Sequence, residues 1–258
     1  MQGISTSAVV PMRVEANERS EMASQLLWGE TFRVEERVGG WLRIHSNFDR
    51  YQAWVSERMV RTFEREAWEQ LSAQPYQVCT GLCTAVSERT GEQQLIPHGS
   101  LLYHYNETTR TFALAEETYK LMQEMPAMPS NKVKGILQTA QSMINSPYLW
   151  GGRTILGVDC SGFTQLCYRL NSAILPRDAC QQAEKGEVVD FITSAKPADL
   201  AFFDNEDGKI AHVGLILNEG KIIHASGRVR INKLDSEGIY SEELGKYTHK
   251  LRLIKRML

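Results

Sequence analysis

Short apolar runs that alternate with polar residues fill the chain up to about residue 124. The segments 31–34 (TFRV) and 41–44 (WLRI) alternate in this way on either side of Gly39 and Gly40, a hairpin turn signal. Further short runs share the pattern: 52–55, 78–86, 101–105 and 111–114. Several short strands at this spacing predict small β-barrels, and about 120 residues suffice for two barrels of about 60 residues each.

The pattern changes after residue 124. The segment 122–130 holds two prolines and no hydrophobic period, which is typical of a linker. Ser130 can cap a helix whose apolar residues recur at helical spacing: Val133, Ile136, Leu137, Ala140 and Ile144. The segment 145–147 (NSP) would end this helix.

Three later runs predict antiparallel strands: 200–203, 211–217 and 221–225. Helices followed by a strand meander are typical of an α+β domain. The sequence therefore predicts three domains, which are β-barrels at 1–62 and 63–124 and an α+β domain at 125–258.

The composition is ordinary for a folded globular protein, with 42% hydrophobic and 23% charged residues. Lys and Arg total 29 against 31 Asp and Glu, which argues against nucleic acid as a partner, because phosphate binding needs a basic excess. No apolar run approaches the ~18–20 residues of a membrane span, and the first residues lack a signal peptide pattern. We expect a cytoplasmic monomer without a membrane span; the alternative is the periplasm, if a signal peptide has been removed.

Five cysteines at irregular spacing do not form a disulfide framework. Cys79 and Cys83 lie four residues apart, but no second pair and no nearby histidine completes a zinc site. We expect packing roles for both, as for Cys167 and Cys180, and we expect no metal and no organic cofactor.

Cys160 differs from the other cysteines because it stands where a glycine-containing loop enters a helix. Apolar residues follow it on one helical face: Phe163, Leu166, Cys167 and Leu170. Unpaired backbone N–H groups at a helix N-terminus stabilise a thiolate and can hold an oxyanion. This position makes Cys160 a candidate nucleophile, and a structural thiol is the alternative.

Two histidines offer the base that a thiol nucleophile needs. His212 and His224 lie on neighbouring predicted strands, and a three-residue loop at 218–220 with Gly220 in the left-handed conformation would place both on one face. A two-residue loop would separate them. On a shared face, Cys160, His212 and His224 supply a nucleophile, a base and an orienting group. The alternative is a pair of hydrogen-bonded strand histidines without a catalytic role.

Five segments together resemble the NlpC/P60 family of papain-like cysteine peptidases, which cut bacterial cell-wall peptides. They are 147–152 (PYLWGG), 158–163 (VDCSGF), 199–203 (DLAFF), 211–214 (AHVG) and 223–226 (IHAS), in the family's order of Cys, His and a polar third residue. The resemblance covers about residues 125–258. It implies a papain-like fold with Cys160 as nucleophile, His212 as general base and acid, and His224 as orienter.

The first 124 residues resemble two bacterial SH3-like barrels. The segments 20–22 (SEM), 25–27 (QLL) and 49–51 (DRY), with Trp54, are similar to the first barrel of one branch of the family. This branch comprises the γ-D-glutamyl-L-diamino acid endopeptidases, or dipeptidyl-peptidases VI, which act on turnover peptides with a free N-terminal L-alanine. The resemblance therefore implies a murein peptide substrate and a role in peptidoglycan recycling.

The resemblance also implies a set of substrate-binding residues: Glu21, Tyr51, Tyr148, Asp159, Ser161, Arg177, Asp178 and Ala179. Glu21 and Tyr51 would reach the substrate's N-terminal end, and Tyr148 would line the site and help to hold the oxyanion. Ala179 stands where some members have serine, which puts one substrate hydrogen bond in doubt.

The residues alone leave other interpretations open. Glu21 can be an exposed charge, Asp159 can be a helix N-cap, and Arg177 with Asp178 can form a surface ion pair. Tyr51 and Trp54 can be barrel core. Two other functions compete, namely a hydrolase of intact peptidoglycan whose barrels anchor it to the wall, and a non-catalytic wall-peptide binding protein.

Two further groups of residues receive no functional role. The first is the remaining histidines: His45, His98, His104 and His249. The second is the basic C-terminal residues, for which a solvated strand or tail is expected: Lys250, Arg252, Lys255 and Arg256.

Overall fold

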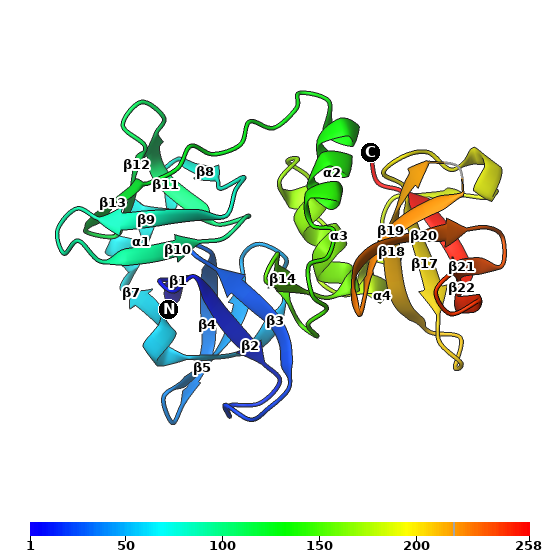
Figure 1. Ribbon diagram of the computed structural model, residues 1–258. Helices are drawn as coiled ribbons and strands as arrows, with labels where there is room; N and C mark the ends of the chain where they lie inside the picture. The colour runs from blue at the N-terminus through cyan, green and yellow to red at the C-terminus, as the bar shows by residue number, and fades with distance from the viewer. Residues whose placement is uncertain (219) are drawn as a thin grey trace. The chain divides into compact units, whose positions relative to one another are not determined.

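A computed structural model of the protein describes residues 1–218 and 220–258. The chain forms two compact units, Met1–Met128 and Pro129–Leu258. The first unit consists mainly of strands, and the second combines helices with a strongly curved sheet (Figure 1). Among the described residues, no helix has the length and apolar character that a membrane span requires.

The first sheet of unit 1 takes up residues 2–63. Its strands are β1 (Gln2–Ser5), β2 (Val9–Arg13), β3 (Met22–Leu27), β4 (Thr31–Val38), β5 (Trp41–Ser46), β6 (Gln52–Ser56) and β7 (Val60–Phe63), with the 3-10 helix η1 (Glu57–Met59) before β7. The predicted hairpin turn between β4 and β5 is confirmed, because Gly39 and Gly40 have φ of 55° and 84°. Ala53 and Val55 face the core, so strand alternation turns the half-buried Trp54 outward, and its assignment to the core is wrong.

The second sheet of unit 1 follows a short helix, α1 (Arg65–Ser72), that the sequence pattern does not predict. Its strands are β8 (Tyr76–Val78), β9 (Cys83–Ser87), β10 (Gln93–Ile96), β11 (Leu101–Asn106), β12 (Thr111–Leu114) and β13 (Glu117–Leu121). The predicted single strand at 78–86 is wrong. β8 lies at one edge of the sheet and β9 next to the opposite edge, so the chain must leave the sheet between them.

The two sheets of unit 1 share a core. Ile4 and Trp28 of the first sheet pack among the buried residues of the second. The N–H of Leu101 donates to the Trp28 carbonyl at 2.9 Å, and the Tyr103 hydroxyl donates to the Gly29 carbonyl at 3.2 Å. Small barrels bury too little apolar surface for high stability alone, and this shared core adds to what each buries.

Unit 2 begins with helices and ends with a sheet. The helices are α2 (Lys132–Ser142), α3 (Cys160–Arg169) and α4 (Ala179–Ala183), with the hairpin β14 (Arg153–Thr154) and β15 (Gly157–Val158) before α3. The sheet contains β16 (Glu187–Val189), β17 (Leu200–Asp204), β18 (Ile210–Asn218), β19 (Lys221–Ser226), β20 (Arg228–Leu234), β21 (Gly238–Ser241) and β22 (Lys246–Arg256), and the 3-10 helix η2 (Ile192–Ser194) follows β16.

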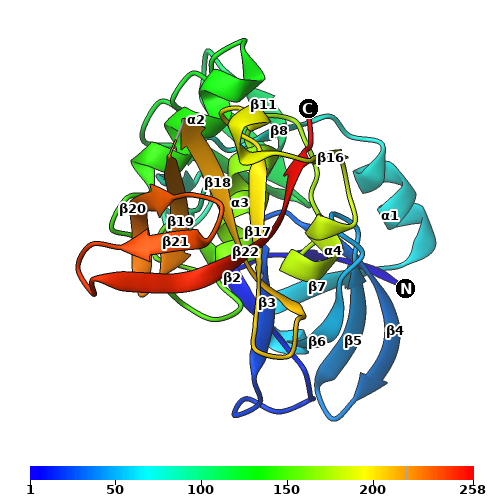
Figure 2. The ribbon, with the colours of Figure 1, turned by 90° about the vertical axis from the view of Figure 1, so that its right-hand side faces the viewer.

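The sheet of unit 2 closes on itself. Its strand order is β16-β22-β17-β18-β19-β20-β21, and β21 also pairs with β22 (Figure 2). The helix α3 packs on β18 and β19, and α2 packs on α3. Every residue of α3 is therefore buried, whereas the sequence pattern predicted one buried face. A hydrophobic cluster that includes Phe203, Ile222 and Ile254 forms a core of this unit.

Two local predictions about α2 are corrected. The N-cap of α2 is Asn131 rather than Ser130, because the Asn131 side chain accepts from the Lys134 N–H at 2.9 Å. α2 ends at Ser142, so Ile144 is exposed.

Of the predicted solvated strand or tail, the strand is what the structure shows. Lys250, Arg252, Lys255 and Arg256 lie in β22, where the first two are exposed and the last two half-buried. Arg256 donates from Nε and Nη2 to the buried Asp199 at 2.9 and 2.7 Å. Since the Asp199 side chain also accepts from the Lys196 N–H, this carboxylate links the end of β22 to the turn before β17.

We expect Phe202→Ala to lower the free energy of unfolding of unit 2 by about 3–5 kcal/mol, because the Phe202 side chain is fully buried and its loss leaves a cavity. Phe191→Ala is the matched control, since Phe191 is 70% exposed and its removal should change stability by about 0.5 kcal/mol or less. Equilibrium urea unfolding measures both. Equal losses in the two variants would contradict the described packing.

Candidate active site

Cys160 is the first residue of α3, as predicted, and Asp159 is the N-cap. Asp159 Oδ1 accepts from the Gly162 N–H at 2.7 Å, which satisfies one of the free amides of the first turn. A Cβ atom on Gly162 would lie 2.2 Å from the Gly152 carbonyl oxygen, so only glycine lets the loop before β14 approach the helix this closely. The loop and the helix start are thus held together beside the thiol.

The Cys160 thiol is nearly buried, with 7% of the residue exposed. Burial raises the pKa of Cys160 to about 11, and the Asp159 carboxylate adds to the rise. The backbone N–H groups of Val213 and Ser161 act in the opposite direction, because they stabilise a thiolate. The resting group at neutral pH is therefore a thiol, and a base must take its proton before it can attack.

His212 and His224 form a hydrogen-bonded chain that continues to Asn232. His212 Nε2 lies 2.8 Å from His224 Nδ1, and His224 Nε2 lies 3.1 Å from Asn232 Oδ1. The Asn232 side-chain N–H donates to the Tyr240 carbonyl at 3.4 Å, which leaves Oδ1 as the acceptor toward His224. Neutral His224 then carries its proton on Nε2 and accepts at Nδ1 from His212. His212 Nδ1 is left unprotonated and able to accept a proton.

The two histidines share a face, as the three-residue loop predicted, but the connection differs. The predicted loop at 218–220 includes Glu219, which lies outside the described residues. Asn218 is a strand residue that pairs with Lys221, and the register shifts by one residue between Ile216 and Asn218. This shift has the same effect on the facing of the strands as one extra loop residue.

Both histidines are neutral at pH 7. Burial lowers the pKa of His212 well below its ordinary value, and His224 and His249 lower it further. Burial lowers the pKa of His224 to about 4, against a smaller opposite effect of the Asn232 hydrogen bond. A proton taken from the thiol would therefore stay on this chain only while the reaction proceeds.

His249, for which the sequence suggested no role, stacks on His212. The ring centroids lie 4.2 Å apart with an interplanar angle of 27°. Asn232 is on β20, a strand that the sequence pattern did not predict, and His249 is on β22, before the residues for which a solvated strand or tail was expected. Neither residue could be found from motif spacing, because both reach the site through strand pairing alone.

Asp159 and Arg177 form a buried ion pair. Arg177 is 1% exposed, and its two terminal nitrogens donate to the two Asp159 oxygens at 3.0 and 2.5 Å. Arg177 also donates to the Ser161 hydroxyl at 2.9 Å. The interpretation of Arg177 and Asp178 as a surface ion pair is therefore wrong.

The Asp159 carboxylate accepts from several other donors besides Arg177. They are the N–H groups of Gly151 and Gly162 and the Ser161 hydroxyl. A carboxylate offers about four acceptor positions, so these donors leave little capacity for a substrate ammonium. This geometry favours the N-cap role of Asp159, and its contact with substrate stays a prediction.

The structure places the remaining predicted residues as follows. Tyr148 is half-buried, and burial together with the charges of Cys160 and Asp159 raises its pKa to about 12. Asp178 forms a capping box with Gln181 at the start of α4. Ala179 is the buried first residue of that helix.

Glu21 and Tyr51 belong to unit 1, whereas the other predicted site residues belong to unit 2. Glu21 is exposed at the start of β3, and the half-buried Tyr51 packs against the core of the first sheet. Their contact with substrate stays a prediction.

The other cysteines are distributed as expected with one exception. Cys79, Cys83 and Cys167 are buried, but Cys180 is exposed, so a packing role for it is wrong. Within the described residues, no group of three or more His, Cys, Asp or Glu side chains is arranged to hold a metal ion.

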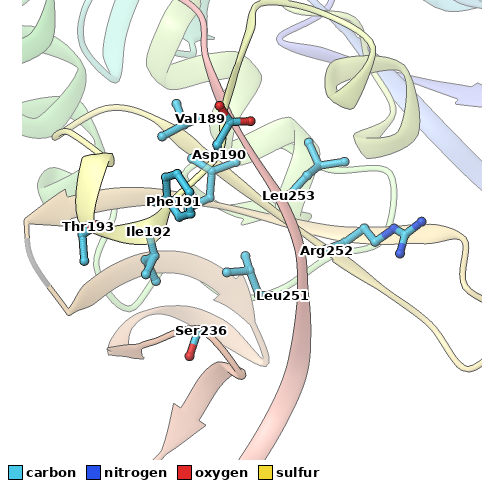
Figure 3. Close-up of a pocket in the computed structure, with 10 residues that line it drawn as sticks. Val189, Asp190, Phe191, Ile192, Thr193, Ser236, Leu251, Arg252 and Leu253 are labelled. Carbon is cyan, nitrogen blue, oxygen red and sulfur yellow. The ribbon is translucent and has the colours of Figure 1, made fainter.

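A pocket of about 350 Å³ lies in unit 2 between the segment 189–193 and β22 (Figure 3). Its lining is mainly apolar, with Phe191, Ile192 and Leu251 among the side chains. None of the predicted site residues lines it, so its position gives no support to a catalytic role.

The model of the NlpC/P60 family matches residues 145–248, which include Cys160, His212 and His224. The model of the bacterial dipeptidyl-peptidase SH3 domain matches residues 12–59. The probable endopeptidase NlpC of Escherichia coli (strain K12) is 34% identical over 110 residues, which are 42% of this chain and 71% of that protein. The chain belongs to the NlpC/P60 family of cysteine peptidases.

Two relatives carry a more specific name. The gamma-D-glutamyl-L-lysine dipeptidyl-peptidase of Bacillus cereus (strain ATCC 10987 / NRS 248) is 26% identical over 257 residues, which cover 88% of this chain and 74% of that protein. The protein of the same name from Bacillus subtilis (strain 168) is 39% identical over 134 residues, which cover 48% of this chain and 45% of that protein.

The fold agrees with the family. A crystal structure of an NlpC/P60 family protein from Bacillus cereus ATCC 10987 superposes with a TM-score of 0.85 at 18% identity, covering 100% of both chains. The predicted α+β papain-like fold with an N-terminal SH3-like domain is confirmed.

We expect Asn232→Ala to slow alkylation of Cys160 by iodoacetamide at neutral pH by about tenfold or more, because His224 loses the acceptor that selects its tautomer. Asn232→Asp keeps an acceptor and adds a negative charge, which favours protonated histidine. The pH midpoint of alkylation should therefore move upward in that variant.

Peptide-resolved mass spectrometry measures the rate at Cys160 separately from that at the exposed Cys180. The rate at Cys180 is the internal control and should not change. Native reactivity of Cys160 in Asn232→Ala would show that Asn232 does not select the tautomer.

Proposed function

We propose that this enzyme hydrolyses the γ-D-glutamyl bond to a diamino acid in murein-derived peptides that carry a free N-terminal L-alanine. The observation that carries the proposal is the neutral chain from Asn232 through His224 to His212 in the same unit as a buried thiol at a helix N-terminus. The names of the two Bacillus relatives and the matching SH3 domain support the substrate class.

In the first step the thiol attacks the γ-carbonyl carbon. His212 Nδ1 takes the proton of Cys160, and the sulfur forms a bond to the carbon as the carbonyl electrons move to oxygen. We assign that oxyanion to the backbone N–H of Cys160 in the first turn of α3, with the Tyr148 hydroxyl as a second donor. Tyr148 is protonated at neutral pH because its pKa is raised to about 12.

In the second step the oxyanion reforms the carbonyl and the C–N bond breaks. His212 returns the proton to the leaving amine of the diamino acid, which leaves an L-Ala-γ-D-Glu thioester on Cys160. Water, deprotonated by the same imidazole, then attacks the thioester and releases L-Ala-γ-D-Glu and the free thiol. Each proton taken by His212 is returned, so no cofactor is consumed.

His224 and Asn232 keep the base oriented throughout these steps. Because His212 donates from Nε2 to His224, its Nδ1 is the nitrogen that exchanges protons with the thiol. The orienting group is a neutral ring rather than a carboxylate, so the positive charge on His212 is weakly stabilised and short-lived. This favours rapid return of the proton to the leaving group.

Substrate selection is the second part of the proposal. The free ammonium of L-alanine needs an anionic partner, and we assign this role to the exposed carboxylate of Glu21, with Tyr51 beside the same end of the peptide. A free alanine amine exists only after the peptide has left the sugar strand, so the enzyme would act on released peptides, in the cytoplasm, rather than on intact wall.

We expect purified enzyme to convert L-Ala-γ-D-Glu-L-Lys or the diaminopimelate analogue to L-Ala-γ-D-Glu, detected by mass spectrometry. Cys160→Ala should abolish this conversion, because no nucleophile remains. Cys180→Ala is the matched control and should keep native activity, since Cys180 is exposed and has no role in the mechanism. Turnover by Cys160→Ala would disprove the mechanism.

We expect N-acetylation of the L-alanine to lower kcat/KM at least about tenfold, the scale of one lost charged hydrogen bond of about 1.5–3 kcal/mol. Glu21→Gln should reduce the preference for the free amine, because the neutral amide no longer favours a cation. Glu18→Gln is the matched control, as an exposed glutamate of the same β2–β3 connection.

The contrary result is equally informative. Equal rates on free and acetylated peptides, together with cleavage of intact peptidoglycan, would indicate a wall hydrolase. In that case the SH3-like region would be an anchor rather than a part of the substrate site.

A further inference from the structure

A third imidazole belongs to the histidine cluster of unit 2. The His249 ring stacks on His212 at 4.2 Å between centroids and meets His224 edge-on at 5.6 Å. His249 Nδ1 lies 2.9 Å from the Thr248 hydroxyl. The mechanism above uses neither this ring nor its protonation.

Five strands contribute residues to the surroundings of His249 or of the rings that it contacts. β18 and β19 contribute His212 and His224, and β17 contributes the neutral Phe203 ring at 6.0 Å. β21 pairs with it through the apolar Ile239. β20 contributes the charge of Arg230, which acts on His224 and is paired with Glu243 at 2.9 Å. Burial lowers the pKa of His249, and no charged group among the described residues adds to this shift.

We propose that His249 is a positioning residue for the catalytic base: its ring holds the plane of His212, and its protonation prevents His212 from accepting the thiol proton in acid. This rests on the proposed function only in so far as Cys160 and His212 react as described.

The stack restricts the rotation of His212. A hydrogen bond from Nε2 to His224 fixes one direction in the ring plane but leaves the ring free to tilt about that bond. A second ring packed face to face at 4.2 Å opposes this tilt. The unprotonated Nδ1 therefore keeps a constant direction, which proton transfer over a short distance requires.

The stack also couples the charges of the two rings. Burial lowers the pKa of His249 from its ordinary value, but that of His224 falls to about 4 and that of His212 lies well below its ordinary value. His249 is the most exposed of the three, so it takes up the first proton on acidification. Like charges about 4 Å apart shift each other's pKa by roughly one unit even in water, so His212 then accepts a proton less readily.

The test compares His249→Phe, which keeps a stacking ring without a titratable group, with His249→Ala, which removes both. Lys250→Gln is the matched control, an exposed neighbour on the same strand. Two measurements are made on the full chain across about pH 4.5 to 9: the rate of Cys160 alkylation by iodoacetamide, and kcat and KM on the peptide. Alkylation needs no substrate, so it tests His249 even if the proposed peptide is not cleaved.

We expect His249→Phe to keep the native alkylation rate and kcat within about threefold at pH 8, with the acid midpoint about one pH unit lower. The downward direction follows because the first proton must then go to His224, whose pKa is about 4. His249→Ala should lose about tenfold in both rates at pH 8 with KM unchanged, and Lys250→Gln should match the native enzyme.

Any of four results would overturn the proposal. An unchanged or raised acid midpoint in His249→Phe would show that His249 is not the group that titrates. Native rates in His249→Ala would show that the stack does not position the base. An equal downward shift in Lys250→Gln would assign the effect to the net charge of the strand. If circular dichroism shows that His249→Ala is unfolded, the loss of activity in His249→Phe at pH 8 would itself overturn the positioning role.

Discussion

The geometry around Cys160 depends on the buried ion pair between Asp159 and Arg177. Removing a carboxylate from water is costly unless a cation and hydrogen-bond donors replace the lost hydration, and Arg177 with three further donors does so here. The same oxygens cap α3, hold the loop at Gly151 and orient Ser161. These contacts fix the backbone at Asp159, and the position of the adjacent Cys160 is fixed with it.

The histidine that we propose as the base is held by a different kind of interaction. His212, His224 and Asn232 form a chain of neutral hydrogen bonds, and burial lowers the pKa of both rings. With the pKa of Cys160 raised to about 11, the resting site carries neither a thiolate nor an imidazolium. In our proposal a buried ion pair next to Cys160 holds the nucleophile in place, and an uncharged hydrogen-bonded chain orients His212, which gains and loses a proton.

The two sheets of unit 1 depend on a shared core. Trp28 and Ile4 of the first sheet complete the core of the second, so neither small barrel depends on its own apolar residues alone. The SH3 match at residues 12–59 lies in the first sheet, and Glu21 lies in the β2–β3 connection of that sheet. In our proposal this SH3-like sheet determines which end of a peptide enters the active site.

Local sequence determined the features that depend on neighbouring residues. Gly39 and Gly40 specified a hairpin turn, the alternation of the strand residues specified β17 to β19, and a loop before Cys160 specified a helix start, because turn conformations, strand facing and capping are decided within a few positions. Five short segments in the family's order of Cys, His and a polar third residue also indicated the family, and with it the fold.

Only the tertiary structure decided which distant residues meet. Arg177 is buried and pairs with Asp159, because a buried carboxylate needs a cation to replace its lost hydration. Asn232 and His249 enter the site because β20 pairs with β19 and β22 closes the sheet beside β17 and β21. Strand order and a one-residue register shift are properties of the whole sheet, and no spacing along the chain encodes them.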